Sequence, residues 1–321
     1  MTEVLSTASA PGKAILLGEH AVVYGKPAIA IPVSELRVEV VIESFKCPAG
    51  DIWIDSPVIR MYKCVNDLPY ENPLRMAVDL TLNACGHPDI PGLMIRINSA
   101  LPIGGGMGSG AAVSCALIRA LSDFVCPNTF TLETINGLVF DVEKIHHGNP
   151  SGVDNTVITY EKPIFFRRGE SLESIQVKQP VNLVLADTGI NSATSSMVAG
   201  VRKRFDQDTV RYNQIFTEIE NLVAKSREAL EQGNTPLLAE AMNENHRLLQ
   251  QIEVSSFALD RLVKTARNSG ADAAKLIGAG GGGNMIALCN PDTEKVVCQA
   301  LNNAGAVRVF AFTLNSNKDS E

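Results

Sequence analysis

The sequence predicts a protein of mixed helices and strands, of the α/β or α+β class, and three observations support this prediction. Short apolar runs with period-two alternation, such as LRVEVVI and GLMIRINSALPI, are typical of half-buried strands. Amphipathic stretches, such as AAVSCALIRALSDF, are typical of helices. Both patterns occur in each half of the 321-residue chain, and this length suggests two domains or one large one.

The first half is expected to begin with strands and continue with helices. Residues 12–42 alternate short apolar runs with glycine and proline, so KAILLG, AVVYG, AIAIPV and LRVEVVI are expected to be strands. A helix is expected over residues 71–85, and the strand in GLMIRINSALPI leads directly into a glycine-rich stretch. Two helices follow, in AAVSCALIRALSDF and in TLETINGLVFDVEKIHHG, with Gly148 as the expected stop of the second.

The second half is separated from the first by residues 170–180, which are polar and weakly patterned and mark a soft domain boundary. A strand is expected in VNLVLADTG, and helices are expected over residues 205–231, 235–252 and 256–269. A glycine-rich element and two terminal strands complete the expected order.

Composition and charge exclude several classes of function. The net charge of -7 argues against a general nucleic-acid or anionic-membrane binder, which would have a basic surface. The seven cysteines are scattered, odd in number and free of any CxxC pair, so we expect reduced thiols in a cytosolic protein. No secretory signal and no membrane-spanning run is expected from the sequence.

The glycine-rich stretch PIGGGMGSGAAV, residues 102–113, stands between an expected strand and an expected helix. Backbone N–H groups at the start of a helix bind anions, and glycine allows them to approach phosphate oxygens closely. The stretch is neither a Walker A loop nor a GxGxxG dinucleotide motif. Taken alone, it is compatible with a phosphate cradle and equally with a tight turn.

Three further segments carry candidate chemistry. Lys13 lies in APGKAILLGEHAVVYGKPAIA, and both Glu143 and Asp154 lie in EKIHHGNPSGVDN. Each is an ordinary surface charge when it is considered alone, and the two histidines of this segment do not form a zinc motif. A second glycine cluster, KLIGAGGGGNMIAL, lies near the C-terminus. Two such clusters in one chain favour a ligand-binding role over a hinge.

Together these segments resemble the three motifs of the GHMP small-molecule kinases, and they are most similar to those of the mevalonate kinases. The segments ADTGINSATSSMVAGVRKR and MNENHRLLQQIEVSS extend the resemblance over nearly the whole chain. The resemblance implies an α+β fold with an N-terminal ATP-binding domain, residues 1–175, that resembles the second domain of ribosomal protein S5. It implies a C-terminal ferredoxin-like domain, residues 176–321, with the active site in the cleft between the two.

The resemblance implies phosphorylation of the 5-hydroxyl of mevalonate by ATP, with Mg²⁺ as cofactor, in isoprenoid precursor synthesis. A related kinase that acts on phosphomevalonate, homoserine or galactose stays open as an alternative, as does a non-catalytic nucleotide-binding regulator. A cytoplasmic protein that binds no nucleic acid and no membrane is expected, and a homodimer is possible within the family.

The resemblance also implies roles for particular residues. Asp154 would act as the base or orienting partner for the acceptor hydroxyl, and Lys13 would neutralise charge on the transferring phosphoryl group. Glu143 and Ser109 would hold Mg²⁺. The residues expected around the ATP phosphates are Pro102, Gly104, Gly105, Gly106, Met107, Gly108, Ser109, Gly110, Ala111 and Ala112. Those expected to bind the acceptor are Lys13, Glu19, His20, Asp154, Thr194, Gly278, Ala279 and Gly280.

The sequence departs from the family pattern at four positions. The family's second serine of the first glycine loop, commonly a Mg²⁺ ligand, is replaced by Gly110. The threonine before the third motif is replaced by Ile277, a usual glycine by Glu253 and a usual cysteine by Asn284. These departures bear on the metal shell and on acceptor specificity. Lys13, Glu143 and Asp154 are all retained.

Overall fold

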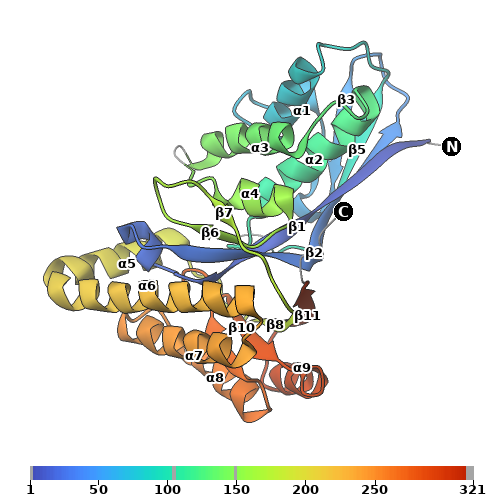
Figure 1. Cartoon of the computed structure of the whole chain (residues 1–321). Helices are drawn as coiled ribbons and strands as arrows, with labels where there is room; N and C mark the ends of the chain where they lie inside the picture. Colours follow the sequence, from blue (N-terminus) through green and yellow to red (C-terminus); the bar gives the residue numbers. More distant parts are fainter. Residues whose placement is uncertain (1–2, 103–105, 148–149, 316–321) are drawn as a thin grey trace. The chain divides into compact units, whose positions relative to one another are not determined.

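The structure of the protein is a computed structural model, and it describes all residues except 1–2, 103–105, 148–149 and 316–321. The chain divides into two compact units that interleave along the sequence (Figure 1). Unit 1 contains Met1–Lys13, Leu36–Ile103 and Met107–Glu161, and unit 2 consists mainly of Ala14–Glu35 and Lys162–Glu321. The expected domain boundary at residue 175 stays a prediction. The α+β class is confirmed, since sheets and helices are present in both units.

Unit 1 is built around a sheet in which the strands follow the order β4-β3-β5-β2, with β1 paired to β2. Strand β3 is parallel to β5, with Ile54 opposite Ile95, and β2 is antiparallel to β5. Strands β1 and β2 are long and continue into unit 2. The strands are β1 (Val4–Leu17), β2 (Ala28–Ser44), β3 (Ile52–Ser56), β4 (Met61–Cys64) and β5 (Leu93–Ser99).

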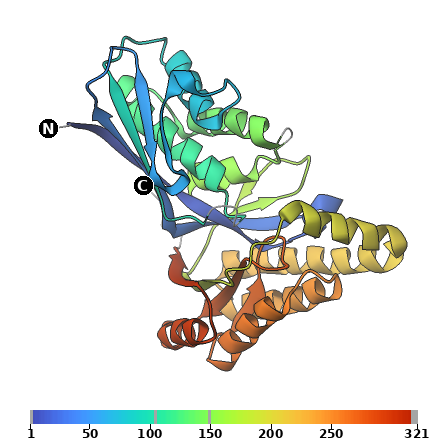
Figure 2. The same ribbon diagram turned by 180° about the vertical axis from the view of Figure 1, so that it is seen from behind.

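The helices of unit 1 lie on one face of this sheet, and Figure 2 shows the sheet from behind. Most side chains of helix α2 are buried, and small and apolar residues such as Ala116 and Leu117 make up this buried face. Asn72 caps α1 by accepting hydrogen bonds from the backbone N–H groups of Leu74 and Arg75. The helices are α1 (Pro73–Ala84), α2 (Ser109–Val125), α3 (Leu132–His147) and α4 (Val153–Tyr160).

Unit 2 contains a four-stranded antiparallel sheet with the strand order β11-β8-β10-β9. Helices α7 and α8 pack against β9, and α9 packs against β8 and β11. The succession of strand, helices, two strands, helix and strand in this order is ferredoxin-like. The strands of unit 2 are β6 (Ile164–Phe166), β7 (Glu173–Ser174), β8 (Val181–Asp187), β9 (Ala273–Leu276), β10 (Asn284–Cys289) and β11 (Arg308–Leu314). The helices are α5 (Thr194–Gln207), α6 (Thr209–Gln232), α7 (Thr235–Gln251), α8 (Phe257–Asn268) and α9 (Glu294–Asn303).

Several expected elements are confirmed and others are corrected. The helix expected over residues 71–85 is α1, and the strands expected in GLMIRINSALPI and VNLVLADTG are β5 and β8. The expected strand AVVYG is wrong, because Ala21–Tyr24 is a short 3₁₀ helix. The two expected strands AIAIPV and LRVEVVI are one continuous strand, β2. Helices α4, α5 and α9 are not among the expected elements, and the stop at Gly148 lies outside the described residues.

The expectation of seven reduced thiols is wrong for two of them. Cys85, at the end of α1, and Cys126, at the end of α2, form a disulfide with a Cα–Cα distance of 5.9 Å. The two helices pack against one another, which brings their C-terminal ends together although 41 residues separate the cysteines in sequence. The remaining five cysteines are free.

Candidate functional site

Lys13 and Asp154 form an ion pair in unit 1, with 3.1 Å between Lys13 Nζ and Asp154 Oδ1. Lys13 is carried by β1 and is 9% exposed, whereas the Asp154 side chain is 31% exposed. Asp154 is the second residue of α4, and Gly152 precedes this helix with φ of 81°. The first turn of a helix favours a carboxylate, because the helix dipole is positive there. A cation and an accessible carboxylate are therefore held side by side.

The start of α2 lies against this pair. The backbone N–H of Lys13 donates to the carbonyl of Met107 over 3.0 Å. Gly108 precedes α2 with φ of 69°, and a Cβ at this position would lie 3.1 Å from Lys13 Cγ and 3.3 Å from Asp154 Oδ2. Glycine is therefore required at position 108 for two reasons: its φ is positive, and the Lys13–Asp154 ion pair approaches the backbone closely. The N–H groups of the first turn of α2, which are of the kind that can bind an anion, thus lie beside a lysine and an aspartate.

Glu143, on α3, lies beside the first turn of α2. It is 4% exposed, and its Oε1 is 3.3 Å from the position that a Cβ of Gly110 would occupy. Ser109, the first residue of α2, is adjacent in sequence. A carboxylate and a hydroxyl are hard oxygen ligands of the kind that Mg²⁺ prefers, and Mg²⁺ retains several waters when it binds protein. The residues present therefore fit a magnesium ion that phosphate oxygens and water also coordinate. Among the described residues, no cluster of three or more His, Cys, Asp or Glu side chains could hold a metal.

The remaining residues expected around the phosphates belong to the same stretch. Gly104 and Gly105 lie outside the described residues. Gly106 is exposed with φ of 68°, and Pro102 is half-buried. Ala111 and Ala112 lie in the first turns of α2 and are buried. The structure thus brings the C-terminal part of the glycine stretch together with Lys13, Asp154 and Glu143.

Lys13 and Asp154 belong to unit 1, and the other residues expected to contact the acceptor lie in unit 2. His20 Nε2 is 2.9 Å from the carbonyl oxygen of Ala279. Since a carbonyl only accepts, Nε2 carries the proton, and burial lowers the pKa of His20, which favours the neutral ring. The hydroxyl of Ser192 donates to the carbonyl of Gly280 over 2.7 Å. Thr194 is exposed at the start of α5, two residues after this contact.

The second glycine cluster is a tight loop between β9 and β10. Gly278, Gly280, Gly281 and Gly283 all have positive φ. A Cβ at Gly280 would lie 2.0 Å from the carbonyl oxygen of Val254, and the N–H of Gly281 donates to this oxygen over 2.8 Å. The glycines are therefore needed for the conformation of the loop and for its close contact with the chain after α7.

Glu19 is the remaining residue of the set expected to bind the acceptor. It is 3% exposed, and its carboxylate accepts hydrogen bonds from Lys275 Nζ and from Asn245 Nδ2. Lys275 is fully buried on β9, and Asn245 is buried on α7. Sequence reasoning missed both partners. The available signal was a lysine within the otherwise apolar run AAKLI, since lysine is rarely buried without a partner.

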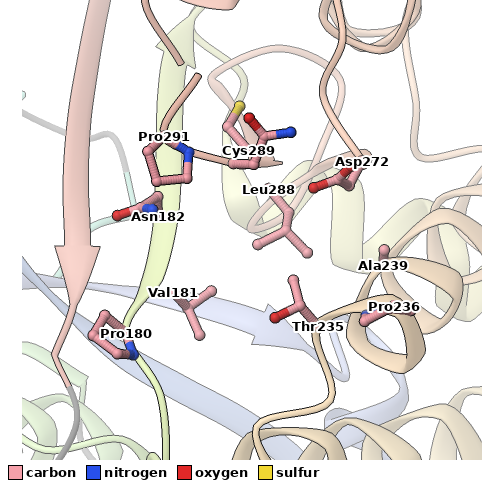
Figure 3. A pocket seen from close by; sticks show the side chains of 11 residues that line it. Pro180, Val181, Asn182, Thr235, Pro236, Ala239, Asp272, Leu288, Cys289 and Pro291 are labelled. Carbon is pink, nitrogen blue, oxygen red and sulfur yellow. The ribbon is translucent and has the colours of Figure 1, made fainter. Parts of the chain in front are cut away.

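A cavity of about 550 Å³ lies elsewhere in unit 2 (Figure 3). Val181 and Leu288 from the sheet and Thr235 from the start of α7 line it, with Asp272 and Cys289 at its edge. Burial raises the pKa of the Cys289 thiol to about 12, so this thiol stays protonated at neutral pH. The residues that line the cavity include none of those expected at the kinase site.

Within the described part of the chain, no helix combines the length and the apolar character that crossing a lipid bilayer requires.

The chain is similar to known proteins over most of its length. The GHMP kinases N terminal domain matches residues 72–162, and the GHMP kinases C terminal domain matches residues 226–307. A mevalonate kinase of Pyrococcus abyssi is 35% identical over 94% of this chain and 93% of its own length.

Two solved structures are also similar. The crystal structure of L. major mevalonate kinase in complex with R-mevalonate has a TM-score of 0.83 and 31% identity, and the match covers 99% of both chains. The mevalonate kinase of Methanococcus jannaschii has a TM-score of 0.80 and 28% identity, over 96% of both chains. Both domain matches, and a relative more than 30% identical over nearly the full length, lead to one assignment: the chain belongs to the GHMP kinase family.

Proposed function

We propose that the protein transfers the γ-phosphoryl group of ATP to the 5-hydroxyl of mevalonate and releases ADP and 5-phosphomevalonate. The observation that carries this proposal is the Lys13–Asp154 pair at the start of α2, with Glu143 beside the same turn. Phosphoryl transfer requires in-line positioning and neutralisation of charge on the phosphate oxygens. One cation, two carboxylates and a set of backbone N–H groups meet this requirement.

Each residue of unit 1 has a distinct role in the proposed reaction. The acceptor oxygen attacks the γ-phosphorus while the bond between this phosphorus and the bridging oxygen of ADP breaks. Asp154 orients the acceptor hydroxyl and receives its proton, because its carboxylate is accessible. Lys13 stabilises the negative charge on the phosphoryl oxygens, and the N–H groups of α2 bind the phosphates of ATP.

A magnesium ion held by Glu143 and Ser109 would neutralise charge on the β- and γ-phosphates. Gly110, which stands where the family usually has a second serine, leaves one protein oxygen fewer for this ion. We therefore expect water to complete the shell, which Mg²⁺ accommodates readily. Glu143 is expected to contribute chiefly to metal and nucleotide binding.

The residues of unit 2 contribute binding of the acceptor in this proposal. The neutral ring of His20 donates through Nε2 to Ala279, which leaves Nδ1 as a hydrogen-bond acceptor. A neutral imidazole of this kind suits a hydroxyl group. The loop from Gly278 to Gly280 is fixed by contacts with Ser192 and with the segment after α7.

The test is a substrate panel in which release of ADP is coupled to a spectroscopic signal. Mevalonate, phosphomevalonate, homoserine and galactose are each supplied with Mg-ATP. We expect turnover with mevalonate and kcat/KM at least about a hundredfold lower with the others, since a site that binds a substrate's polar groups rejects analogues lacking them. Turnover with one of the other three compounds and none with mevalonate would show that the protein acts on a different acceptor of the family. Ile277 and Gly110, which depart from the family pattern, are the reason to test these acceptors.

The cytoplasmic location, the homodimer and the absence of nucleic-acid and membrane partners stay predictions. Cell fractionation tests the location, and light scattering on the purified protein gives its mass in solution. A mass near the 34.4 kDa of one chain would exclude the homodimer.

A further inference from the structure

A buried ion pair in unit 2 involves three segments of the chain that are far apart in sequence. The side chains of Glu19 and Lys275 are 1% and 0% exposed, and Lys275 Nζ donates to Glu19 Oε1. Asn245 Nδ2 donates to the other carboxylate oxygen, Oε2, over 3.0 Å. Lys275 Nζ also donates to the carbonyl of Leu276 over 2.7 Å. Both oxygens of Glu19 are therefore already engaged by protein donors.

The energetics of this cluster favour an architectural role over direct binding of a ligand. Burial raises the pKa of Glu19 and lowers the pKa of Lys275, because both charges have lost their hydration. Such a pair is stable only while both partners are in place, since removal of one leaves an uncompensated buried charge. A carboxylate that left Lys275 to bind a substrate would incur this cost in every catalytic cycle.

The segments that meet at this cluster are those that carry the expected acceptor contacts. Glu19 directly precedes His20, and Lys275 lies on β9 three residues before Gly278. His20 has φ of 59° and ψ of -47°, an unfavourable conformation for a residue with a side chain. Such a conformation persists only where the surrounding structure determines it fully. The anchored carboxylate of Glu19 and the hydrogen bond from His20 to Ala279 supply this constraint.

We propose that Glu19, Lys275 and Asn245 are positioning residues that hold His20 and the loop from Gly278 to Gly280 for the acceptor, and that the Glu19 carboxylate does not itself bind the acceptor. This proposal rests on the proposed kinase function for its kinetic test. It replaces the sequence-based expectation that Glu19 is a direct contact. The Asn245 amide keeps Glu19 Oε2 in place, and its own Oδ1 has no hydrogen-bond partner among the described residues.

The test uses single and double variants of the full chain. Glu19→Gln and Lys275→Met should each lower kcat/KM for mevalonate about 10- to 100-fold, the scale expected when a binding group is displaced by about 1 Å. The effect should lie mainly in KM for mevalonate, with KM for Mg-ATP within about twofold of the parent. The double variant E19Q/K275M has no unpaired buried charge, so it should recover at least about tenfold relative to Glu19→Gln.

The double variant separates positioning from contact. If Glu19 bound the acceptor directly, removal of Lys275 would not repair Glu19→Gln, and the double variant would be as impaired as the single one or worse. This result would overturn the proposal, as would a Glu19→Gln enzyme with unchanged KM for mevalonate. Glu244→Gln is the matched control, because this half-buried carboxylate lies on the same helix as Asn245 and pairs with Arg247 at the surface.

Two further measurements keep the proposal open to refutation if a single variant does not fold or if mevalonate is not the substrate. Asn245→Ala removes one hydrogen bond to Glu19 without creating an unpaired charge, and it should raise KM for mevalonate in the same direction by a smaller factor. Hydrogen–deuterium exchange needs no substrate. We expect faster exchange in residues 18–25 and 277–283 of Asn245→Ala, with α1 and α2 unchanged. Equal exchange of these segments in the parent and the variant would contradict the positioning role whatever the acceptor.

Discussion

Substitution of Gly110 by serine tests how this chain holds a magnesium ion. A Cβ at position 110 would meet one described heavy atom within 4 Å, the Oε1 of Glu143 at 3.3 Å. A serine hydroxyl there would lie next to the carboxylate that we assign to the metal. This hydroxyl would replace a coordinated water, and release of one ordered water is worth about 0–2 kcal/mol. We therefore expect Gly110→Ser to tighten metal binding about threefold to tenfold, which corresponds to about 0.7–1.4 kcal/mol.

The assay is titration of Mn²⁺ in the presence of ADP, followed by electron paramagnetic resonance, together with the Mg²⁺ dependence of the rate. Gly110→Ala is the control, because it adds the same Cβ beside Glu143 without an oxygen. Metal affinity that is equal in the serine and alanine variants would refute the prediction that a hydroxyl at position 110 coordinates the ion beside Glu143. Weaker binding in the serine variant alone would show that the position does not face the ion.

Three further predictions concern stability. Gly280→Ala should destabilise the protein by more than about 2 kcal/mol, because its Cβ would overlap a backbone carbonyl. Gly278 has the same sign of φ, but no described heavy atom lies within 4 Å of a Cβ at this position, so Gly278→Ala should destabilise the protein less. Urea denaturation of the two variants compares their free energies of unfolding. Burial, with a smaller contribution from Arg267, lowers the pKa of His246 from 6.5 to about 4. The unfolded chain therefore binds this proton more tightly than the folded chain does. As a result, the free energy of unfolding should fall by about 3 kcal/mol as the pH drops from 6.5 to 4. His246→Asn should lose this part of the pH dependence, and an unchanged urea-midpoint profile in that variant would contradict the assignment. Reduction of the Cys85–Cys126 disulfide, which closes a loop across 41 residues, should lower the free energy of unfolding by about 4 kcal/mol, and an unchanged melting temperature in dithiothreitol would count against the bond.

The sequence predicted the elements whose apolar pattern is strong and local. The helix over Pro73–Ala84 follows the cap residue Asn72 and begins with a proline, and the strand Leu93–Ser99 has alternating apolar residues. The segment Ala21–Tyr24 has strand-forming residues, yet the turn that begins at Gly18 and ends at Gly25 closes it into a 3₁₀ helix through backbone hydrogen bonds. The helix Thr194–Gln207 escaped prediction because it buries only Val201 among its described side chains and so has little apolar periodicity.

The candidate site was predicted to the extent that its residues lie in recognisable motifs. Lys13, Asp154 and Glu143 were each proposed from a motif, and the structure places all three at the start of α2. The buried partners of Glu19 were not predicted. Lys275 lies 256 residues from Glu19 in sequence, and a pairing over such a distance is determined by tertiary structure, with no local pattern to reveal it.

Asp154→Asn tests whether the Lys13–Asp154 pair carries out phosphoryl transfer. This variant keeps the shape of the side chain and removes its charge and basicity. We measure kcat with mevalonate and, separately, the affinity for Mg-ATP. We expect kcat to fall about 10²- to 10⁴-fold while the Kd for Mg-ATP changes little, because Asp154 acts on the acceptor hydroxyl. A variant that retains the kcat of the parent would contradict the claim.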